Sequence, residues 1–536
     1  MCPMEIGIDF GTTYSTLCFS PGRGVEGCVP ESNSIYVPTV VGFRSDGTFT
    51  VGNGALLEPD LDLYRDIKRF FGVNYLNKDK LLSKIKPSFE VVVEDWGCSI
   101  GPSNGKRGAT KSVVALASLF ISGLVSLAIR MTGQQVSVSV CSVPAEYNSY
   151  QRGFIYEACK LSNISVQAVV NEPTAAGLST FISIPKSDMN YLLVYDFGGG
   201  TFDCSLLVVG AAYVCVVDSR GDNFLGGRDV DRRLLEIVAR KSGLREEELD
   251  AFSMEALKID MVDRPNLSSR KVLTKAGVVR SVNFTSREFF DLCQPFVRRA
   301  RDIVVELLSG KTLSRVTAVL IGGSSVLPGV SDSLASVPGI SQVLFERKSY
   351  RAAVALGAAL YAQTFTGSSR YRLVDAISGS LSDEYSGLKA VCVFPKSHPI
   401  PATVENTFTM PSGNTFVLLM QGESTMANMN EVTFKAEVPL RQFPAKTSLL
   451  QNTRVFEDGR IEVSLNGQRI HNSVVPRIPT PSEISNKFES SDNRRIGPEV
   501  AKVKLFYEGL LGVSNLSQLP RESRRKHYLN HGLISD

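Results

Sequence analysis

Two stretches of the chain share one order of hydrophobic and polar positions. Each begins with an apolar run, passes through a short turn that contains aspartate and glycine, and continues into a second apolar run; the first occupies residues 6–19 and the second residues 193–209. An apolar run, a tight turn and another apolar run predict a β-hairpin. Two such hairpins in one chain predict a duplicated α/β fold whose halves face each other.

Further segments fit an α/β fold. Val136–Val143 alternates valine with serine or cysteine, as a half-buried strand does, and ends before Pro144. Residues 319–325 predict a strand that runs into a glycine turn, and we expect a helix after Pro328. Residues 352–361 are small and apolar, which predicts a helix packed closely against its neighbours.

Residues 112–129 form an uncharged stretch of 18 residues, which is at the lower limit for a membrane-spanning helix. Ser118, Ser122 and Ser126 recur every four residues and so share one helical face. The rest of the helix surface is apolar. We therefore expect a buried helix of a soluble domain and no transmembrane segment, with a membrane or partner contact as the alternative.

The character of the sequence changes near residue 367. From residue 373 to residue 470 short apolar runs are broken by Gly, Pro and Asn, which predicts an all-β module. A linker is expected at residues 476–495, and a short helix from Pro498 to near Gly512. The strands are expected at residues 390–394, 403–409, 415–421, 431–436 and 460–465, and the domains at residues 1–368, 369–475 and 476–536.

The amino-acid composition excludes some classes of catalytic and binding site. All four histidines lie at or after His398, so a Ser-His-Asp triad is excluded in the first two thirds of the chain. The 58 basic and 54 acidic residues leave a net charge of +4, which makes no strong case for direct nucleic-acid binding. The ten cysteines include no CxxC pair, and the first residues carry neither a secretory nor a myristoylation signal. We therefore expect reduced thiols in the cytosol.

The two glycine–threonine turns suggest a ligand. Backbone N–H groups and threonine hydroxyls suit phosphate oxygens, and the neighbouring Asp9 and Asp196 suit a Mg²⁺ ion held through its water molecules. The chain lacks a GxxxxGK[ST] sequence, so this is not a P-loop site. Two ordinary β-turns are the alternative, and the matching flanks of the two copies count against it.

These turns and four further motifs resemble the heat shock protein 70 family and occur in that family's order. The resemblance covers about residues 4–470 and implies a two-lobed actin-like ATPase domain with duplicated ribonuclease-H-like lobes, followed by a β-sandwich-like C-terminal domain and a short tail. The motifs are DFGTTYS at residues 9–15, DIKR at 66–69, VPA at 143–145, NEPTAA at 171–176, DFGGGTFD at 196–203 and GGRD at 226–229.

The resemblance implies that ATP and Mg²⁺ bind and that ATP is hydrolysed. It assigns catalysis to Lys68, Glu172, Asp196 and Thr201, and the metal and its waters to Asp9, Asp196 and Asp203. It assigns nucleotide binding to Gly11, Thr12, Thr13, Tyr14, Gly198, Gly199, Gly200, Gly226, Gly227, Ser268, Gly322, Gly323 and Ser324.

The sequence departs from the family's pattern at the end of the site that would bind adenine. Val326 stands where the family has an arginine that stacks on the base, and Pro265 interrupts the stretch that resembles the adenosine-binding helix. Arg264 and Ser268 are the residues that match there. We therefore expect weaker ATP binding or less selectivity for the base, because stacking and polar contacts to the purine are missing.

Residues 476–536 are too few for the long helical lid of the cellular chaperones. In this respect, and at residues 222–229, 373–375 and 394–396, the chain is most similar to the heat shock protein 70 homologues of closteroviruses, in particular the leafroll type. That similarity implies a chaperone-type ATPase for virion tail assembly and cell-to-cell movement. Its partners would be viral coat and tail proteins or other protein clients, in the host cytoplasm, the virion tail and plasmodesmata.

Three alternatives remain open. The chain could be a structural or adaptor protein in which nucleotide only stabilises the fold, as the residues Val326 and Pro265 suggest. It could be an ordinary cytosolic peptide-binding chaperone, although the missing lid counts against that, or, least well supported, a sugar kinase of the same superfamily. The basic cluster at residues 521–526 is expected to be a solvated tail, with a contact to a partner or RNA as the alternative.

Overall fold

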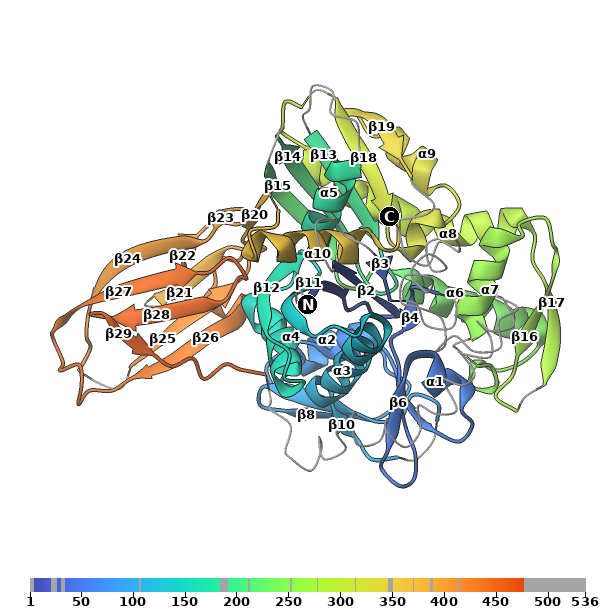
Figure 1. The fold of residues 1–536 in the computed structure, drawn as a ribbon, viewed down its shortest axis with the longest axis horizontal. Coiled ribbons are helices and arrows are strands. Elements are labelled where there is room, and N and C mark those ends of the chain that lie inside the picture. Colours follow the sequence, from blue (N-terminus) through green and yellow to red (C-terminus); the bar gives the residue numbers. More distant parts are fainter. Residues whose placement is uncertain are drawn as a thin grey trace.

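The computed structural model shows an α/β part from which a β-rich arm projects to one side (Figure 1). The arm comprises residues 377–476. The predicted linker beyond Pro476, the helix expected from Pro498 and the basic cluster at residues 521–526 lie outside the described residues. The structure describes residues 4–20, 27–29, 34–105, 108–183, 191–210, 213–250, 253–276, 278–313, 315–345, 350–369, 371–385, 389–412 and 415–476.

The first predicted hairpin lies at the centre of the first large sheet. β1 (Met4–Asp9) and β2 (Tyr14–Ser20) pair antiparallel, with Asp9 opposite Thr16. β11 (Val136–Val143), which coincides with the predicted alternating strand, joins β1 in parallel. The remaining strands are β3 (Gly27–Cys28), β4 (Val37–Pro38) and β12 (Val166–Asn171), in the order β12-β11-β1-β2-β3 with β4 also paired to β2.

The second predicted hairpin occupies the same place in a second sheet. β13 (Tyr191–Phe197) and β14 (Phe202–Val209) pair antiparallel with Asp196 opposite Asp203, and β18 (Val316–Ile321) joins β13 in parallel. This mixed α/β architecture with several sheets fits an actin-like ATPase fold. The other strands are β15 (Tyr213–Asp222), β19 (Ile340–Leu344), β20 (Arg372–Ala376) and β23 (Pro399–Ile400), in the order β19-β18-β13-β14-β15-β20-β23.

Two helices lie between the large sheets. α10 (Ala353–Phe365) packs on β1 and on α5 (Glu172–Ser183), and α5 packs in turn on the second sheet (Figure 1). The helices approach so closely that a Cβ atom on Gly357 would lie 1.7 Å from the carbonyl oxygen of Ala175. The closely packed helix predicted for residues 352–361 is therefore confirmed.

Smaller elements complete the α/β part, and α9 (Val330–Ala335) is the helix expected after Pro328. Three small sheets contain β5 (Val41–Phe43), β6 (Phe49–Val51) and β7 (Asp62–Tyr64); β8 (Val91–Glu94), β9 (Gly97–Ile100) and β10 (Lys111–Ser112); and β16 (Ser269–Leu273) and β17 (Val279–Asn283). The remaining helices are α1 (Gly52–Leu57), α2 (Lys78–Ile85), α4 (Ser149–Leu161), α6 (Gly227–Ser242), α7 (Ser253–Asp263) and α8 (Ser286–Leu308), with the 3₁₀ turns η1 (Ile67–Phe70), η2 (Glu246–Glu248) and η3 (Gly323–Val326).

The uncharged stretch forms α3 (Val113–Thr132), and 72% of its most apolar window is buried inside the protein. It packs against α4, where Ser118 and Ser162 share a hydrogen bond of 2.8 Å between their Oγ atoms. Among the described residues this is the one helix that is long and apolar enough to cross a membrane. Its burial agrees with the expected core helix.

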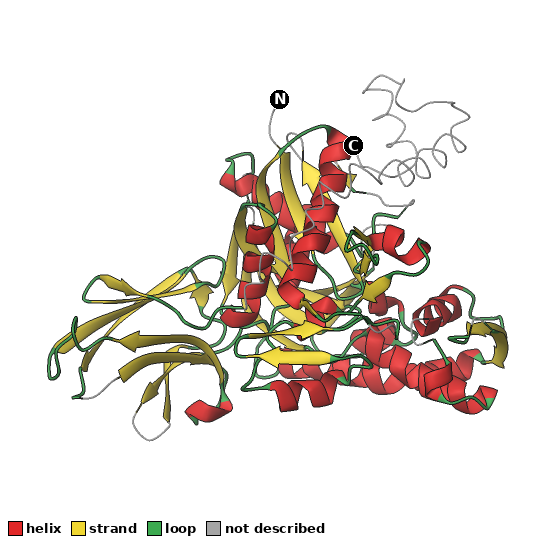
Figure 2. Cartoon of the chain, turned by 90° about the horizontal axis from the view of Figure 1, so that it is seen from below, coloured by secondary structure: helices red, strands yellow, loops and turns green. Residues whose placement is uncertain are grey.

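The β-rich arm consists of two four-stranded sheets that enclose a core of their own (Figure 2). All five expected strands are confirmed, as β22 (Lys389–Phe394), β24 (Ala402–Thr409), β25 (Thr415–Gln421), β26 (Glu431–Val438) and β28 (Ile461–Leu465). Three strands of these sheets were not predicted, namely β21 (Leu381–Tyr385), β27 (Ser448–Val455) and β29 (Gln468–Ile470). In β27 the inward positions include the buried polar residues Gln451 and Thr453, which interrupt the apolar alternation. The sheets are β21 (Leu381–Tyr385), β22 (Lys389–Phe394), β25 (Thr415–Gln421) and β26 (Glu431–Val438), and β24 (Ala402–Thr409), β27 (Ser448–Val455), β28 (Ile461–Leu465) and β29 (Gln468–Ile470), with the 3₁₀ turn η4 (Ala427–Met429).

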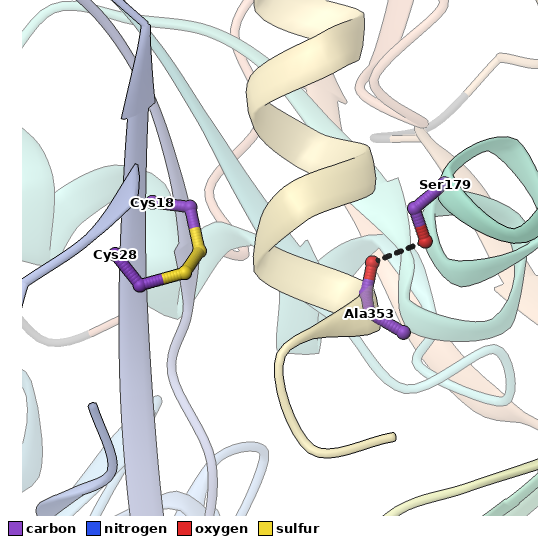
Figure 3. Close-up of a disulfide and its surroundings, with 4 residues drawn as sticks. All are labelled: Cys18, Cys28, Ser179 and Ala353. Carbon is purple, nitrogen blue, oxygen red and sulfur yellow. Dashed lines mark hydrogen bonds between the residues drawn. A yellow bond between two sulfur atoms is a disulfide. The ribbon is translucent and has the colours of Figure 1, made fainter. Parts of the chain in front are cut away.

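One cysteine pair corrects the expectation of reduced thiols. Cys18 and Cys28 lie opposite each other on β2 and β3, with Cα atoms 3.9 Å apart, and form a disulfide. Figure 3 shows this disulfide beside α10, whose Ala353 carbonyl accepts a 2.8 Å hydrogen bond from Ser179 of α5. The strand register, which sequence spacing did not reveal, brings the two sulfur atoms together. The free cysteines in the described part are Cys98, Cys141, Cys159, Cys204, Cys215, Cys293 and Cys392.

Candidate functional site

The turns of the two large hairpins face each other across a cavity of about 120 Å³. A Cβ atom on Gly199 would lie 2.3 Å from Oγ1 of Thr13, and one on Gly200 would lie 2.6 Å from Oγ1 of Thr12. The backbone of one turn therefore lies against the threonine side chains of the other. Glycine is needed at both positions because a Cβ atom would collide with the threonine side chain of the opposite turn.

Most residues that the resemblance assigns to the nucleotide line this cavity, although they come from distant parts of the sequence. The third glycine turn, after β18, also reaches it: Gly322 has a φ of 80°, and a Cβ atom there would lie 2.4 Å from Oδ1 of Asp196. The predicted residues that line the cavity are Asp9, Gly11, Thr12, Thr13, Tyr14, Lys68, Glu172, Asp196, Gly198, Gly199, Gly200, Thr201, Gly227, Gly322, Gly323 and Ser324.

Three predicted residues lie outside the lining. Asp203 is buried behind it and accepts a 3.0 Å hydrogen bond from the backbone N–H of Ala145. Gly226 packs against the backbone of the second glycine turn, since a Cβ atom there would lie 2.6 Å from the nitrogen of Gly200. Ser268 is exposed beyond the end of α7 and lines no described cavity next to the glycine turns.

A buried ion pair closes the inner end of the cavity. Nζ of Lys68 lies 2.5 Å from Oε1 of Glu172, and the two side chains are only 3% and 8% exposed. Lys68 sits on η1, whose backbone carbonyl at this residue accepts a 3.1 Å hydrogen bond from the hydroxyl of Tyr147. Glu172 is the first residue of α5, directly before Pro173, which is favoured in the first turn of a helix.

Buried carboxyl groups surround this ion pair. Burial, and next the charge of Glu172, raise the pKa of Asp9 to about 7, although Lys68 opposes the shift. The same two causes raise the pKa of Asp196 and of Asp203 well above the ordinary value of 3.8. One lysine thus faces four carboxyl groups, and added positive charge would favour the ionised forms of Asp9, Asp196 and Asp203.

The arrangement fits a hydrated divalent cation. Oδ2 of Asp203 is buried without a hydrogen-bond partner among the described residues, and Asp9 accepts a 3.3 Å bond from Ser142. Within the described part of the chain, no three acidic, histidine or cysteine side chains converge as direct metal ligands. Carboxylates that are near but not convergent suit a Mg²⁺ ion that keeps several of its water molecules.

The structure adds charged residues that sequence reasoning missed. Arg228 lines the cavity and reaches across it, with Nε 2.9 Å from Oδ1 of Asp66, directly before η1. Lys258 on α7 also lines the cavity and donates to the carbonyl of Gly227 at 3.0 Å. The sequence contained a signal for Arg228, because this residue is the third of the GGRD motif.

A second cluster in the same cavity consists of one arginine and two tyrosines. The guanidinium of Arg351 lies over the rings of Tyr36 and Tyr350, at 5.3 and 5.2 Å from their centroids, and all three residues line the cavity. No motif marked these residues. A cation between aromatic rings is nevertheless a surface on which a planar group can stack.

The two departures from the family's pattern lie in one separate apolar cavity of about 250 Å³. It lies between the end of α7 and the segment after η3. Arg270, which also borders it, directs its guanidinium to Asp260 and to the Arg264 carbonyl. The apolar residues that line the cavity are Met261, Val262, Pro265, Phe284, Phe289, Val326 and Pro328.

Comparison with known proteins places the chain in a family. The family described as Hsp70 protein matches residues 5–446. The movement protein Hsp70h of Grapevine leafroll-associated virus 3 is 37% identical over 479 residues, which cover 88% of this chain and 86% of that protein. The movement protein Hsp70h of Beet yellows virus is 31% identical over 458 residues, which cover 81% of this chain and 76% of that protein.

A cellular chaperone is also similar over nearly the whole chain. Chaperone protein DnaK of Deinococcus deserti is 28% identical over 565 aligned positions, which cover 99% of this chain and 88% of that protein. The family match spans both large sheets and most of the β-rich arm. The chain belongs to the Hsp70 family.

Proposed function

We propose that this protein binds ATP with Mg²⁺ and hydrolyses it to ADP and phosphate. The observation that carries the proposal is the buried pair of Lys68 and Glu172 at the inner end of a cradle formed by two opposed glycine–threonine turns. Membership of the Hsp70 family, whose members are ATPases, supports ATPase activity in general.

Each group in the cradle has a proposed task. The backbone N–H groups of the turns at residues 11–14 and 198–201 bind the phosphate oxygens, and the hydroxyls of Thr12, Thr13 and Thr201 add hydrogen bonds. Asp9, Asp196 and Asp203 hold Mg²⁺ through its water molecules, and the ion neutralises charge on the phosphates.

Hydrolysis requires a positioned water molecule. Glu172 and Asp196 accept hydrogen bonds from this water and orient its oxygen toward the γ-phosphorus, while Lys68 neutralises the charge that develops there. The bond between the γ-phosphorus and the bridging oxygen breaks, ADP leaves with that oxygen, and the proton of the water passes to the phosphate product. The pair of Lys68 and Glu172 holds both side chains in place before the reaction.

The proposal also assigns a role to each region of the chain. Residues 1–368 form a two-lobed ATPase domain with duplicated ribonuclease-H-like lobes, residues 369–475 a β-sandwich-like partner-binding domain, and residues 476–536 a tail. ATP hydrolysis changes the angle between the lobes, and this motion shifts the β-rich arm.

The relatives suggest where this activity is used. Two of them are named movement proteins of plant viruses. We propose that this chain likewise serves viral cell-to-cell movement and virion tail assembly, with coat and tail proteins as partners, in the cytoplasm, the virion tail and plasmodesmata of the host.

A second candidate function rests on the apolar cavity around Val326 and Pro265. In this alternative the chain is a structural adaptor in which bound nucleotide stabilises the fold and is not hydrolysed. An apolar base end weakens recognition of adenine but leaves the phosphate cradle complete, so hydrolysis remains the better-supported function.

ATP turnover by the purified chain tests the proposal. We expect Mg²⁺-dependent release of phosphate that falls about 10²–10³-fold in Lys68→Ala, since loss of one positioned charge at a transition state has this cost. Glu172→Gln should lose activity similarly and keep ATP binding. Lys78→Ala, an exposed lysine on α2, is the matched control and should turn over normally. Saturable ATP binding without hydrolysis above background would favour the adaptor.

A further inference from the structure

A second cavity of about 290 Å³ lies directly behind the catalytic lysine. Thr12, Lys68 and Thr201 line both this cavity and the nucleotide cavity, so their side chains form the wall between the two. In the proposed ATPase the γ-phosphate lies at Lys68. The product phosphate therefore forms next to this wall, while ADP still fills the cavity on the other side.

Five cationic side chains and three glutamates line the second cavity, so its lining carries an excess of positive charge. Arg69 follows Lys68 on η1, its side chain is only 6% exposed, and it lies 3.5 Å from the carboxylate of Asp229. Its Nε atom is buried without a hydrogen-bond partner among the described residues, whereas Nη2 is the atom that faces Asp229. Lys84 on α2 borders the same cavity, with Nζ 4.9 Å from the ring centroid of Phe224. An unused guanidinium donor in a cavity that a second cation also borders suits a phosphate ion.

The β-rich arm forms one side of this cavity. Lys396 of the arm lies in the lining and is 3.0 Å from Oε1 of Glu146, and Ser378 of the arm donates a 2.9 Å hydrogen bond to the Tyr147 carbonyl. Gln421 accepts a 2.7 Å bond from the backbone N–H of Ser149. The cavity therefore exists in this form only while the arm is seated against the α/β part.

We propose that this cavity is the exit route of the cleaved phosphate, and that the seated arm limits how fast phosphate leaves. The proposal rests on the proposed ATPase function and adds a second anion site to it. Phosphate passes from Lys68 to Arg69 and then toward Lys84, so each step exchanges one cation for another. Because Lys396 and the arm border the route, movement of the arm away from Glu146 opens it.

Single-turnover kinetics can separate hydrolysis from phosphate release. Acid quench measures the cleavage of ATP, and a fluorescent phosphate-binding sensor measures the appearance of free phosphate. Lys84→Glu places a negative charge on the route without touching the nucleotide cavity. We expect phosphate release to slow about fivefold in this variant while cleavage keeps the wild-type rate. Lys78→Glu makes the same charge change on the same helix outside the cavity and should alter neither rate.

Equal release rates in Lys84→Glu and Lys78→Glu would overturn the exit route and leave the ATPase assignment intact. Absence of cleavage in the wild-type protein would instead overturn the ATPase assignment. In that case equilibrium binding of radioactive inorganic phosphate to the Mg²⁺·ADP-loaded chain decides. Weaker binding by Lys84→Glu than by Lys78→Glu supports a second anion site, and equal binding by the two variants rejects it.

Discussion

The two ends of the proposed nucleotide site differ in packing and in polarity. At the phosphate end, Gly199 and Thr13 leave no room for a further side chain, and the neighbouring groups are polar or charged. At the base end, Val326 and Pro265 border an apolar cavity whose nearby arginine, Arg270, is already paired with Asp260. If the proposed site binds a nucleotide, we expect it to hold the phosphates firmly and to select the base only weakly.

This contrast has a consequence for specificity. Hydrogen-bond donors and acceptors reject a wrong ligand strongly because they are left unpaired, whereas an apolar cavity discriminates weakly between planar bases. The cluster of Arg351 with Tyr36 and Tyr350 offers a stacking surface, but a stacking surface accepts every base. Triphosphates other than ATP should consequently be accepted by this protein.

The largest effect is expected when the phosphate end is filled. Gly199→Val would place side-chain atoms where Thr13 now lies, and overpacking of this kind costs about 1–3 kcal/mol, which is roughly 5- to 150-fold in affinity for any nucleotide. Titration with a fluorescent ATP analogue measures the loss. Gly379→Val is the matched control, because a Cβ atom there would meet only Oε1 of Glu423 and the nitrogen of Gly422, both at 3.8 Å, and Gly379 does not line the nucleotide cavity. A similar loss in both variants would show that the cradle does not depend on close packing.

A smaller effect is expected when the base end is made polar. Val326→Arg adds a guanidinium to the apolar cavity, and a cation stacked on an aromatic ring contributes about 0.5–2 kcal/mol. We expect the affinity for ATP, measured by competition binding, to rise roughly tenfold because the added guanidinium can stack on the base. Val305→Arg, at an exposed position on α8, controls for the added charge. A wild-type protein that already prefers ATP over UTP tenfold would contradict the comparison.

The sequence was most informative where one local pattern determines the structure. The two hairpins, β11, α10 and five strands of the arm follow from periodicity and turn residues, which act over a few positions. β27 was missed because buried Gln451 and Thr453 satisfy their polar groups within the arm, and such tertiary compensation leaves no apolar pattern. The disulfide of Cys18 and Cys28 was missed because it depends on strand register.

The candidate site shows the same limit. The glycine turns could be predicted because their motifs are contiguous, and the structure brings them to one cavity. Arg228 and Lys258 could not be placed, since their positions depend on how α6 and α7 approach Asp66 and Gly227. The cavity behind Lys68 depends on the seated arm, which no short motif encodes.

The smallest effect concerns the buried carboxyl groups at the phosphate end. The pKa of Asp9 is raised to about 7, so between pH 4 and pH 7 the folded protein binds more protons at this group than the unfolded chain does. Stability without ligand therefore falls as the pH rises through this range, and the loss is complete above the folded pKa. Mg²⁺·ADP favours the ionised carboxylate and should offset this loss.

We therefore expect Mg²⁺·ADP to raise the melting temperature more at pH 8 than at pH 6. The extra increase should be roughly 2 °C, which corresponds to about one pKa unit of free energy. Asp9→Asn cannot ionise at this position, so its ligand-induced shift should be smaller and should depend less on pH than in the wild-type protein. Asp383→Asn is the control, because burial also raises the pKa of this carboxyl group but it lies in the arm. A pH-independent shift in the wild-type protein would mean that the acidic groups do not hold the cation. The phosphate end would then rely on its backbone N–H groups and Lys68 alone.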